Sequence, residues 1–411
     1  MALGLINFRL FDGENLLDGF HRAVLIDGDR IAGVFDSRDA LAPNVKRVDL
    51  QGATLMPGLI DAHFHCNSPS LDVGAIDRLH PSHLAQHARE HLESMLARGF
   101  TTVRDAGGAD YGLVKAIDEG LIKGPRLFIA GRAISQTGGH GDLRPAHEFE
   151  ICGCGYKGAL AQVVDGANAM RRAVRDELRK GAHQIKLFIS GGVLSPTDPI
   201  WMDQFTDHEV KVAVEEAKRW RTYVMAHSHT AAASARCAIN GVRSIEHGTL
   251  IDQKTAQIIA DHKAYVVPTI SVMASISDEV ASLPQTALDK LAEIKDQAGE
   301  ALEHCHKAGV KLGLGTDLFG QLHGRELDEL RERAKIDGSL NALRSATSVN
   351  AEIMDKQGEL GVIKQGALAD VIAIRGNPVE NIALFEDPNS SIGLIMRGGQ
   401  TVRDTFSSGA D

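Results

Sequence analysis

Short apolar runs separated by turns occupy both ends of the chain. Near the N-terminus, "HRAVLIDGDRIAGVFD" alternates apolar and polar positions around Asp27-Gly28-Asp29, which is a hairpin signal. The far end repeats this style in "GALADVIAIRGNP" and "SIGLIMRGGQTVRD". Because the termini of one domain often lie close together, we expect residues 1–57 and 360–411 to form one small composite β-sandwich domain.

Between these ends, apolar runs of strand length alternate with amphipathic segments of helix length. For example, "DGANAMRRAVRDELRKGA" and "TDHEVKVAVEEAKRW" carry charges on one face and Ala, Val or Leu on the other. This alternation predicts an α/β fold, a (β/α)8 TIM barrel over residues 58–359. The apolar runs end near eight positions, which are His63, Asp105, Gly131, Ser190, His227, His247, Ser271 and Asp317.

Composition narrows the class of protein. The formal net charge of -10 and the lack of a long Lys/Arg block argue against a nucleic-acid partner. No signal-like N-terminus and no run of 18 apolar residues is present, so we expect a cytoplasmic protein without a membrane partner. The five cysteines are scattered and odd in number, which indicates reduced thiols, and "CGCG" at 152–155 is only a weak metal signal.

The stretch "TLMPGLIDAHFHC" ends an apolar strand on two histidines, His63 and His65. Side chains two residues apart on a strand share one face, so both imidazoles can reach one ion. In a parallel barrel all strand C-termini open onto the same mouth. His227, His247 and Asp317 end other strands, so together these side chains offer ligands suited to borderline divalent ions such as zinc.

Lys186 is unusual because it lies inside the apolar run "QIKLFISGG". An ammonium group there would be costly to desolvate. A neutral amine can instead add carbon dioxide and form a carbamate, which is anionic and can bridge two cations. We therefore expect carbon dioxide, bound as the carbamate of Lys186, to be part of the site.

Six motifs together resemble those of the amidohydrolase superfamily, in its binuclear-metal branch with a carboxylated lysine. They are "MPGLIDAHFH", "GFTTVRDAGG", "GRAISQTGGHGD", "QIKLFISGGVLSPTDP", "SIEHGT" and "LGLGTD". The resemblance covers nearly the whole chain. It is strongest to Xaa-Pro dipeptidases (prolidases) and N-acyl-amino-acid carboxypeptidases, with ochratoxinase-like amidases and imidazolonepropionase as wider relatives.

The resemblance implies two divalent metal ions, which we expect to be zinc. His63, His65 and Asp317 would hold the more buried ion, His227 and His247 the other, and carboxylated Lys186 would bridge them. It also implies that His140, in the "TGGHGD" loop, contacts the substrate. At the position two residues after His227, where the dipeptidases are expected to have a tyrosine, this chain has His229.

The function that follows is hydrolysis of a C–N amide bond in a dipeptide or an N-acyl amino acid. A metal-bridging hydroxide would attack the carbonyl, Asp317 would shuttle the proton, and His229 or His140 would stabilise the oxyanion. His323, in the loop after strand eight, is a further candidate for contact with the small-molecule amide substrate. The resemblance also suggests a homo-oligomer.

Alternatives remain open from the sequence. The same machinery could hydrolyse a xenobiotic amide, carbamate or urea. A deaminase is disfavoured because "HSHTAAAS" offers no acid after the strand-five histidine, and a non-catalytic assembly protein is disfavoured because all six ligands are present. His83, His87 and His91 form a stripe at helical spacing, which we interpret as a solvated face.

Overall fold

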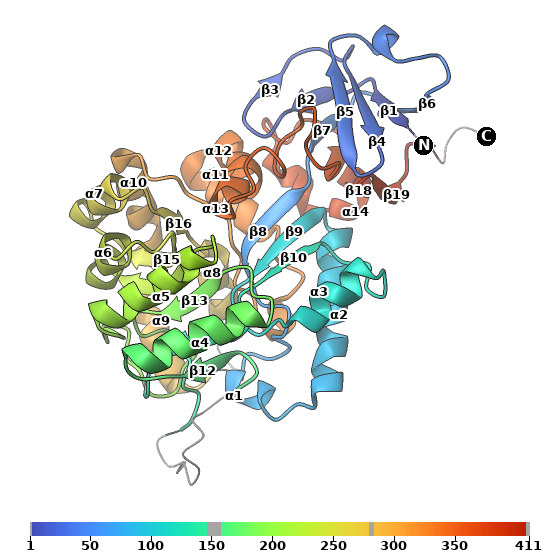
Figure 1. Cartoon of the computed structure of the whole chain (residues 1–411). Helices are drawn as coiled ribbons and strands as arrows, with labels where there is room; N and C mark the ends of the chain where they lie inside the picture. The colour runs from blue at the N-terminus through green and yellow to red at the C-terminus, as the bar shows by residue number, and fades with distance from the viewer. Residues whose placement is uncertain (1, 146–157, 279–282, 408–411) are drawn as a thin grey trace.

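The computed structural model describes residues 2–145, 158–278 and 283–407, and Figure 1 shows a barrel with a smaller β unit at one end. The "CGCG" segment lies outside the described residues, and the three described cysteines, Cys66, Cys237 and Cys305, are buried free thiols. Within the described ranges, no helix combines the length and apolarity needed to span a bilayer.

The smaller unit consists of two sheets that draw strands from both ends of the chain. The first sheet has the strand order β5, β4, β1, β6, and the second has the order β19, β18, β17, β7, β2, β3. In the second sheet, N-terminal β7 pairs antiparallel with C-terminal β17. The strands are β1 (Leu3–Ile6), β2 (Arg9–Phe11), β3 (Leu16–Leu17), β4 (Ala23–Asp27), β5 (Arg30–Phe35), β6 (Lys46–Asp49), β7 (Thr54–Pro57), β17 (Val371–Ile374), β18 (Ile392–Arg397) and β19 (Gln400–Asp404).

Apolar residues on both faces of the second sheet explain why this unit holds together and stays on the barrel. One face packs into a core with the first sheet, where Leu5 and Val24 meet Val371 and Met396. The opposite face belongs to a second core that it shares with barrel residues such as Phe100. The predicted composite domain is therefore confirmed, whereas its limits at residues 57 and 360 stay predictions.

The barrel wall is made of parallel strands, and its last position lacks regular strand structure. β10 adjoins β13 through the bond from His183 N to Ile129 O, 2.8 Å. Residues 312–317 close the wall, since Gly313 N bonds to Val266 O and Ala62 N bonds to Leu314 O. The wall strands are β8 (Leu59–Phe64), β9 (Phe100–Asp105), β10 (Arg126–Ile129), β13 (Ile185–Phe188), β14 (Val224–Thr230), β15 (Ser244–Leu250) and β16 (Tyr265–Val267).

Two details of the predicted wall need correction. The seventh strand ends at Val267, and Ser271 already lies in helix α8, whose first residue is Ile270. The short strands β11 (Ala133–Ser135) and β12 (Ala161–Val163), which the alternation did not predict, extend the sheet beside β13.

Helices surround the barrel wall (Figure 1). Local sequence fixes where they begin; α5, for example, starts at a capping box in which Thr206 and Glu209 satisfy each other's backbone N–H groups. The helices are α1 (Val73–Ile76), α2 (Pro81–Ala97), α3 (Tyr111–Asp118), α4 (Ala167–Arg179), α5 (Asp207–Arg219), α6 (Ala231–Ile239), α7 (Gln253–Asp261), α8 (Ile270–Asp278), α9 (Gln285–Ile294), α10 (Ala298–Ala308), α11 (Asp328–Asp337), α12 (Ser339–Arg344), α13 (Asn350–Ile353) and α14 (Pro388–Ser391).

The two units are joined closely at two places. Gly58 alone separates β7 from β8, and a Cβ atom there would lie 2.2 Å from Thr101 Oγ1, so the position requires glycine. In addition, Arg126 of β10 forms a two-pronged ion pair with Asp370, which precedes β17, with contacts of 2.6 and 3.1 Å. The Asp370 side chain is 4% exposed, which shields this pair from water.

We predict that Asp370→Ala lowers the free energy of unfolding by about 1–3 kcal/mol, because it leaves the Arg126 guanidinium half-buried without its partner. Urea denaturation followed by circular dichroism measures the change. The matched control is Asp289→Ala, which removes an exposed carboxylate on α9. An equal effect of the two substitutions would contradict a special role for the ion pair between the units.

Candidate metal centre

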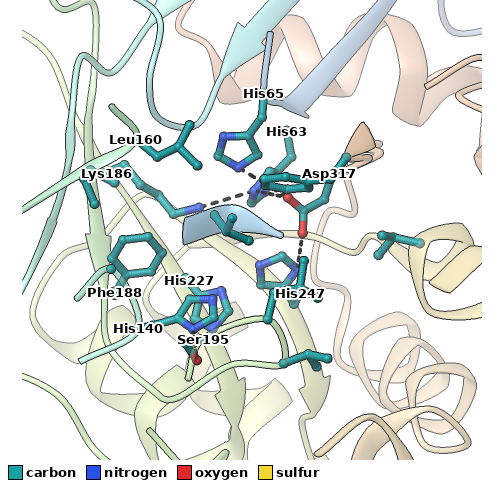
Figure 2. Close-up of a pocket in the computed structure, with 18 of the residues that line it drawn as sticks. His63, His65, His140, Leu160, Lys186, Phe188, Ser195, His227, His247 and Asp317 are labelled. Carbon is teal, nitrogen blue, oxygen red and sulfur yellow. Dashed lines mark hydrogen bonds and ion pairs between the residues drawn. The ribbon is translucent and has the colours of Figure 1, made fainter. Parts of the chain in front are cut away.

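The strand ends bring eight of the nine predicted site residues to one cavity of about 90 Å³ (Figure 2). β8 supplies His63 and, just beyond it, His65; β13 supplies Lys186 from within the wall. Asp317 lies at the end of residues 312–317. The eight residues are His63, His65, His140, Lys186, His227, His229, His247 and Asp317.

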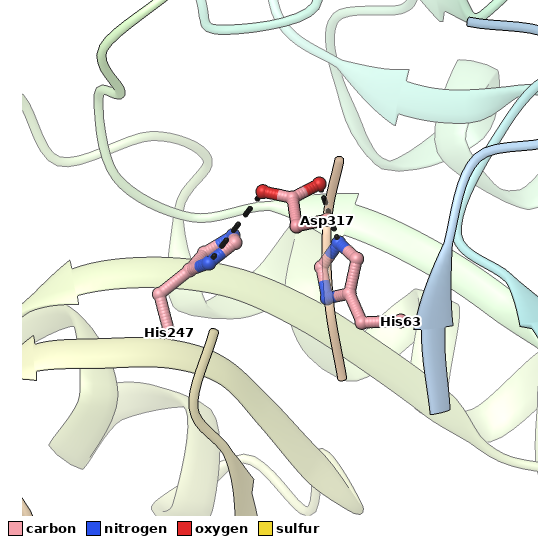
Figure 3. Close-up of side chains that lie close together, drawn as sticks. All are labelled: His63, His247 and Asp317. Carbon is pink, nitrogen blue, oxygen red and sulfur yellow. Dashed lines mark ion pairs between the residues drawn. The ribbon is translucent and has the colours of Figure 1, made fainter. Parts of the chain in front are cut away.

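Three of these side chains offer donor atoms that all lie within 4.8 Å of one another, namely His63, His247 and Asp317 (Figure 3). Asp317 Oδ1 lies 3.3 Å from Nε2 of His63 and 3.3 Å from Nε2 of His65. Imidazole and carboxylate at such spacing match the ligand set of zinc and similar divalent ions. The residues therefore fit a divalent metal.

Hydrogen bonds behind the imidazoles determine which ring nitrogen is free. Nδ1 of His63 contacts Glu246 Oε2 at 2.8 Å, and Nδ1 of His65 contacts Gly107 O at 2.9 Å. Both partners only accept, so each Nδ1 carries the proton and each Nε2 keeps its lone pair. Nδ1 of His247 contacts Thr269 Oγ1 at 2.8 Å, and this hydroxyl can either accept from Nδ1 or donate to it.

Glu246 and Arg104 support His63, and the sequence analysis missed both. Their side chains are 0% exposed and form an ion pair of 3.0 Å inside the barrel. Burial alone would raise the pKa of Glu246, but the charge of Arg104 and the hydrogen bond from His63 lower it to about 2. The usable signal was a charged residue inside each of two predicted wall strands, Arg104 in "TTVRD" and Glu246 in "SIEHG".

Lys186 lies fully within the barrel, with Nζ 3.3 Å from Nε2 of His63. Burial lowers the pKa of Lys186 from 10.5 to about 8. About a tenth of the amine is therefore neutral at pH 7, the form that can react with carbon dioxide. The structure thus supplies the reactive state that a carbamate requires.

The other histidines of the site form a second group around His227. Nε2 of His227 lies 3.2 Å from Gly191 O, and Nδ1 of His229 lies 2.9 Å from Thr249 Oγ1. Burial holds the pKa of His227 well below 6.5 and lowers that of His229 to about 3. Neutral imidazoles are the form in which histidine binds metal or accepts a hydrogen bond.

Two residues of the site have left-handed backbone conformations that non-glycine residues rarely adopt. The φ angle is 71° at His247 and 54° at Asp317. Such strain costs about 1–3 kcal/mol per residue and persists where the surrounding structure enforces it. Its occurrence at these two residues supports a functional role for their side-chain directions.

The structure corrects the placement of His323, which lies outside the cavity. Gly320 N bonds to Ser68 O at 2.8 Å, and this turn carries His323 to Ser68 Oγ, 2.9 Å away, and onto the ring of His91. Phe319 lines the cavity instead. His91 is therefore partly buried, and the expectation of a solvated face holds for His83 but not for His91.

Comparisons with known proteins agree with this geometry. A family model described as the amidohydrolase family matches residues 54–402, and one described as the NagA composite domain matches residues 3–55. The chain is 32% identical to an ochratoxinase from Aspergillus niger over 408 residues, which is 95% of this chain and 84% of the relative.

Solved structures show the same relationship over the whole fold. A prolidase complexed with N-methylphosphonate-L-proline has 43% identity and a TM-score of 0.93, with 98% of this chain and 100% of that chain covered. A Xaa-Pro dipeptidase with methionine bound in its active site has 29% identity and a TM-score of 0.88, with 98% and 100% covered. The chain thus belongs to the amidohydrolase family, as a hydrolase that acts on C–N bonds and has a candidate site for divalent metal.

Proposed function

We propose that this protein hydrolyses the C–N amide bond of a dipeptide, such as an Xaa-Pro dipeptide, or of an N-acyl amino acid. The observation that carries the proposal is the meeting of six metal-ligand-type side chains with an apolar cavity at one mouth of the barrel. His63, His65 and Asp317 would hold one ion and His227 and His247 the other, with carboxylated Lys186 between them. Zinc suits this mixture of imidazole and carboxylate ligands.

Bound divalent cations supply a strong nucleophile at neutral pH by lowering the pKa of water from about 16 towards about 7. Asp317 accepts the proton of the attacking water and delivers it to the departing amine nitrogen. Burial alone would raise the pKa of Asp317, but its surroundings, His63 first among them, hold the pKa well below 3.8. Asp317 is therefore ionised at neutral pH, which is the form that can bind a cation and take up a proton during the reaction.

Apart from the six candidate ligands, the polar side chains that line the described part of the cavity are those of His140, Ser195 and His229. Because Nδ1 of His229 is held by Thr249, its Nε2 remains for the carbonyl oxygen or the substrate carboxylate. His229 takes this role in place of the tyrosine expected in the dipeptidases. An imidazole is shorter than a phenol, so the substrate would sit deeper at this point.

The rest of the cavity is apolar and favours a hydrophobic acyl group or side chain. Among the described residues that line it there is no arginine, and Lys186 is its only lysine. A substrate carboxylate would therefore rely on the Nε2–H group of His229, whereas Nε2 of His140 would accept a hydrogen bond from the substrate. The apolar lining residues are Val73, Ala133, Leu143, Leu160, Ala161, Phe188, Val193, Leu194, Val272, Met273, Ile276 and Phe319.

This lining also supports a second candidate function, hydrolysis of an apolar xenobiotic amide. The ochratoxinase similarity over 95% of the chain favours it. Carbamate and urea hydrolysis would use the same groups. The deaminase and the non-catalytic assembly protein remain disfavoured for the reasons found in the sequence, and homo-oligomer formation stays a prediction.

A substrate panel separates the two candidates. We predict that Xaa-Pro dipeptides and N-acyl amino acids are cleaved with a kcat/KM at least about tenfold above that of the same amides without the carboxylate. Product amines released by the metal-loaded enzyme are quantified by mass spectrometry. The dipeptidase proposal would be rejected in favour of the second candidate if the enzyme cleaved aryl amides or carbamates but no carboxylated substrate.

Asp317→Asn should lower kcat by about 100-fold or more, because the amide side chain cannot accept the proton. Metal content, measured by elemental analysis, should stay close to that of the unaltered protein, since the amide retains one oxygen that can bind the ion. Asp252→Asn, at the exposed N-cap of α7, is the matched control and should leave kcat unchanged. Turnover near the normal rate in Asp317→Asn would remove Asp317 from the role of proton shuttle.

Formation of the carbamate should speed up as the pH rises from 7 to 9. The neutral fraction of Lys186 increases through its pKa of about 8, from about 10% to about 90%. Metal-free protein is incubated with zinc at a fixed concentration of dissolved ¹³C-labelled carbon dioxide, and the carbamate signal is followed by NMR. Lys186→Gln should give no signal. A rate that is flat or falls with pH would contradict the assignment.

A further inference from the structure

His140 lies in a tightly packed position at the edge of the cavity (Figure 2). We call this position the His140 seat; it is formed by Phe188, Gly192, Ser195, Asp198 and His227. Its ring stacks on that of His227, with centroids 4.3 Å apart and an interplanar angle of 22°, and meets the ring of Phe188 edge-on. A Cβ atom at Gly192 would lie 2.2 Å from Cε1 of His140, so the ring rests directly on the glycine backbone. Little room is left for the imidazole to move in this seat.

The hydrogen bonds around His140 determine which of its two ring nitrogens carries the proton. Nδ1 lies 2.9 Å from Ser195 Oγ and 3.3 Å from Oδ2 of Asp198. The hydroxyl of Ser195 donates to Gly192 O at 3.1 Å, so its lone pairs face His140, and a carboxylate only accepts. Nδ1 must therefore carry the proton, and Nε2 is the nitrogen left for the substrate.

Asp198 is a fully buried carboxylate behind the ring of His140. Its side chain is 0% exposed. Oδ2 accepts from Gly192 N at 3.0 Å, whereas Oδ1 has no hydrogen-bond partner among the described residues and lies 4.0 Å from Nζ of Lys290. Burial alone would raise the pKa of Asp198, but His140, Ser195 and Lys290 hold it below its usual value, so the carboxylate stays ionised beside His140.

Lys290 stabilises the seat through hydrogen bonds from a distant part of the chain. It lies on α9, and its Nζ donates to Gly192 O at 3.0 Å and to Ser195 O at 2.8 Å. These bonds hold the turn that carries both partners of His140. The turn follows β13, whereas α9 follows β16, so the seat depends on segments about 100 residues apart.

We propose that Asp198 is the positioning residue for His140, holding Nδ1–H so that Nε2 is presented to the substrate, and that Lys290 stabilises this arrangement. The inference rests on the proposed function in that His140 contacts the substrate. Neither Asp198 nor Lys290 is among the residues that line the cavity. Both therefore act through His140.

A double-mutant cycle tests the proposal. Asp198→Asn should lower kcat/KM by about 10- to 100-fold without loss of bound metal, as is typical of residues behind an active-site imidazole. In the background of His140→Asn, the same substitution should cause no further loss, because its effect passes through the missing ring. Equal losses in both backgrounds would overturn the proposal and indicate general damage to the fold.

Asp165→Asn is the matched control, because this exposed carboxylate ties down Thr137 of the same loop without contacting His140. It should leave kcat/KM unchanged, and a loss as large as that of Asp198→Asn would show that any disturbance of the loop suffices. If Asp198→Asn does not fold, Lys290→Met takes its place in the cycle, with the same expected non-additivity.

A crystal structure of metal-loaded Asp198→Asn gives a readout that does not need activity. The ring of His140 should leave its stack on His227 or occupy two positions, and a ring that stays unchanged would contradict the proposal. If the unaltered enzyme cleaves no amide at all, the proposed function fails, but this structural result still decides the role of Asp198.

Discussion

The carboxylate of Glu246 lies inside the barrel between the guanidinium of Arg104 and the imidazole of His63, and the candidate metal centre depends on this buried charge network. Without Arg104, an ionised carboxylate at this depth would be far too costly to desolvate. Without Glu246, nothing would hold Nδ1 of His63 protonated and turn its lone pair towards the mouth. Charged side chains therefore take the place of apolar packing inside the barrel, and they fix the direction of the His63 imidazole.

The barrel wall and the loops above it have different roles in the site. The barrel wall and the ends of its strands carry the candidate ligands, whose directions are restrained by hydrogen bonds behind them or by strained backbone, as at His247 and Asp317. Loops carry the groups that would contact substrate, of which His140 is the clearest. A rigid wall suits ions that tolerate little variation in ligand distance, whereas loops allow relatives to differ in what they bind.

The architecture and most of the site could be predicted because strand alternation and strand ends leave a regular trace in the sequence. That trace was sufficient to predict that His63, Lys186 and His227 lie at the site. It failed where the chain is irregular: the glycine-rich run to Asp317 forms no regular strand, and a tight turn takes His323 away from the cavity. Asp198 and Lys290 could not be predicted, because only tertiary folding brings an irregular loop and a helix together.

The composite sheet has a consequence for how the protein is made. β7 has its neighbour β17 more than 300 residues further along the chain, so the N-terminal strands leave the ribosome long before the second sheet can be completed. Until β17 is available, one edge of β7 lacks its partner, and an unpaired strand edge can pair wrongly with another nascent chain. Cells that synthesise this protein at high rates should therefore need a chaperone that covers this edge until translation ends.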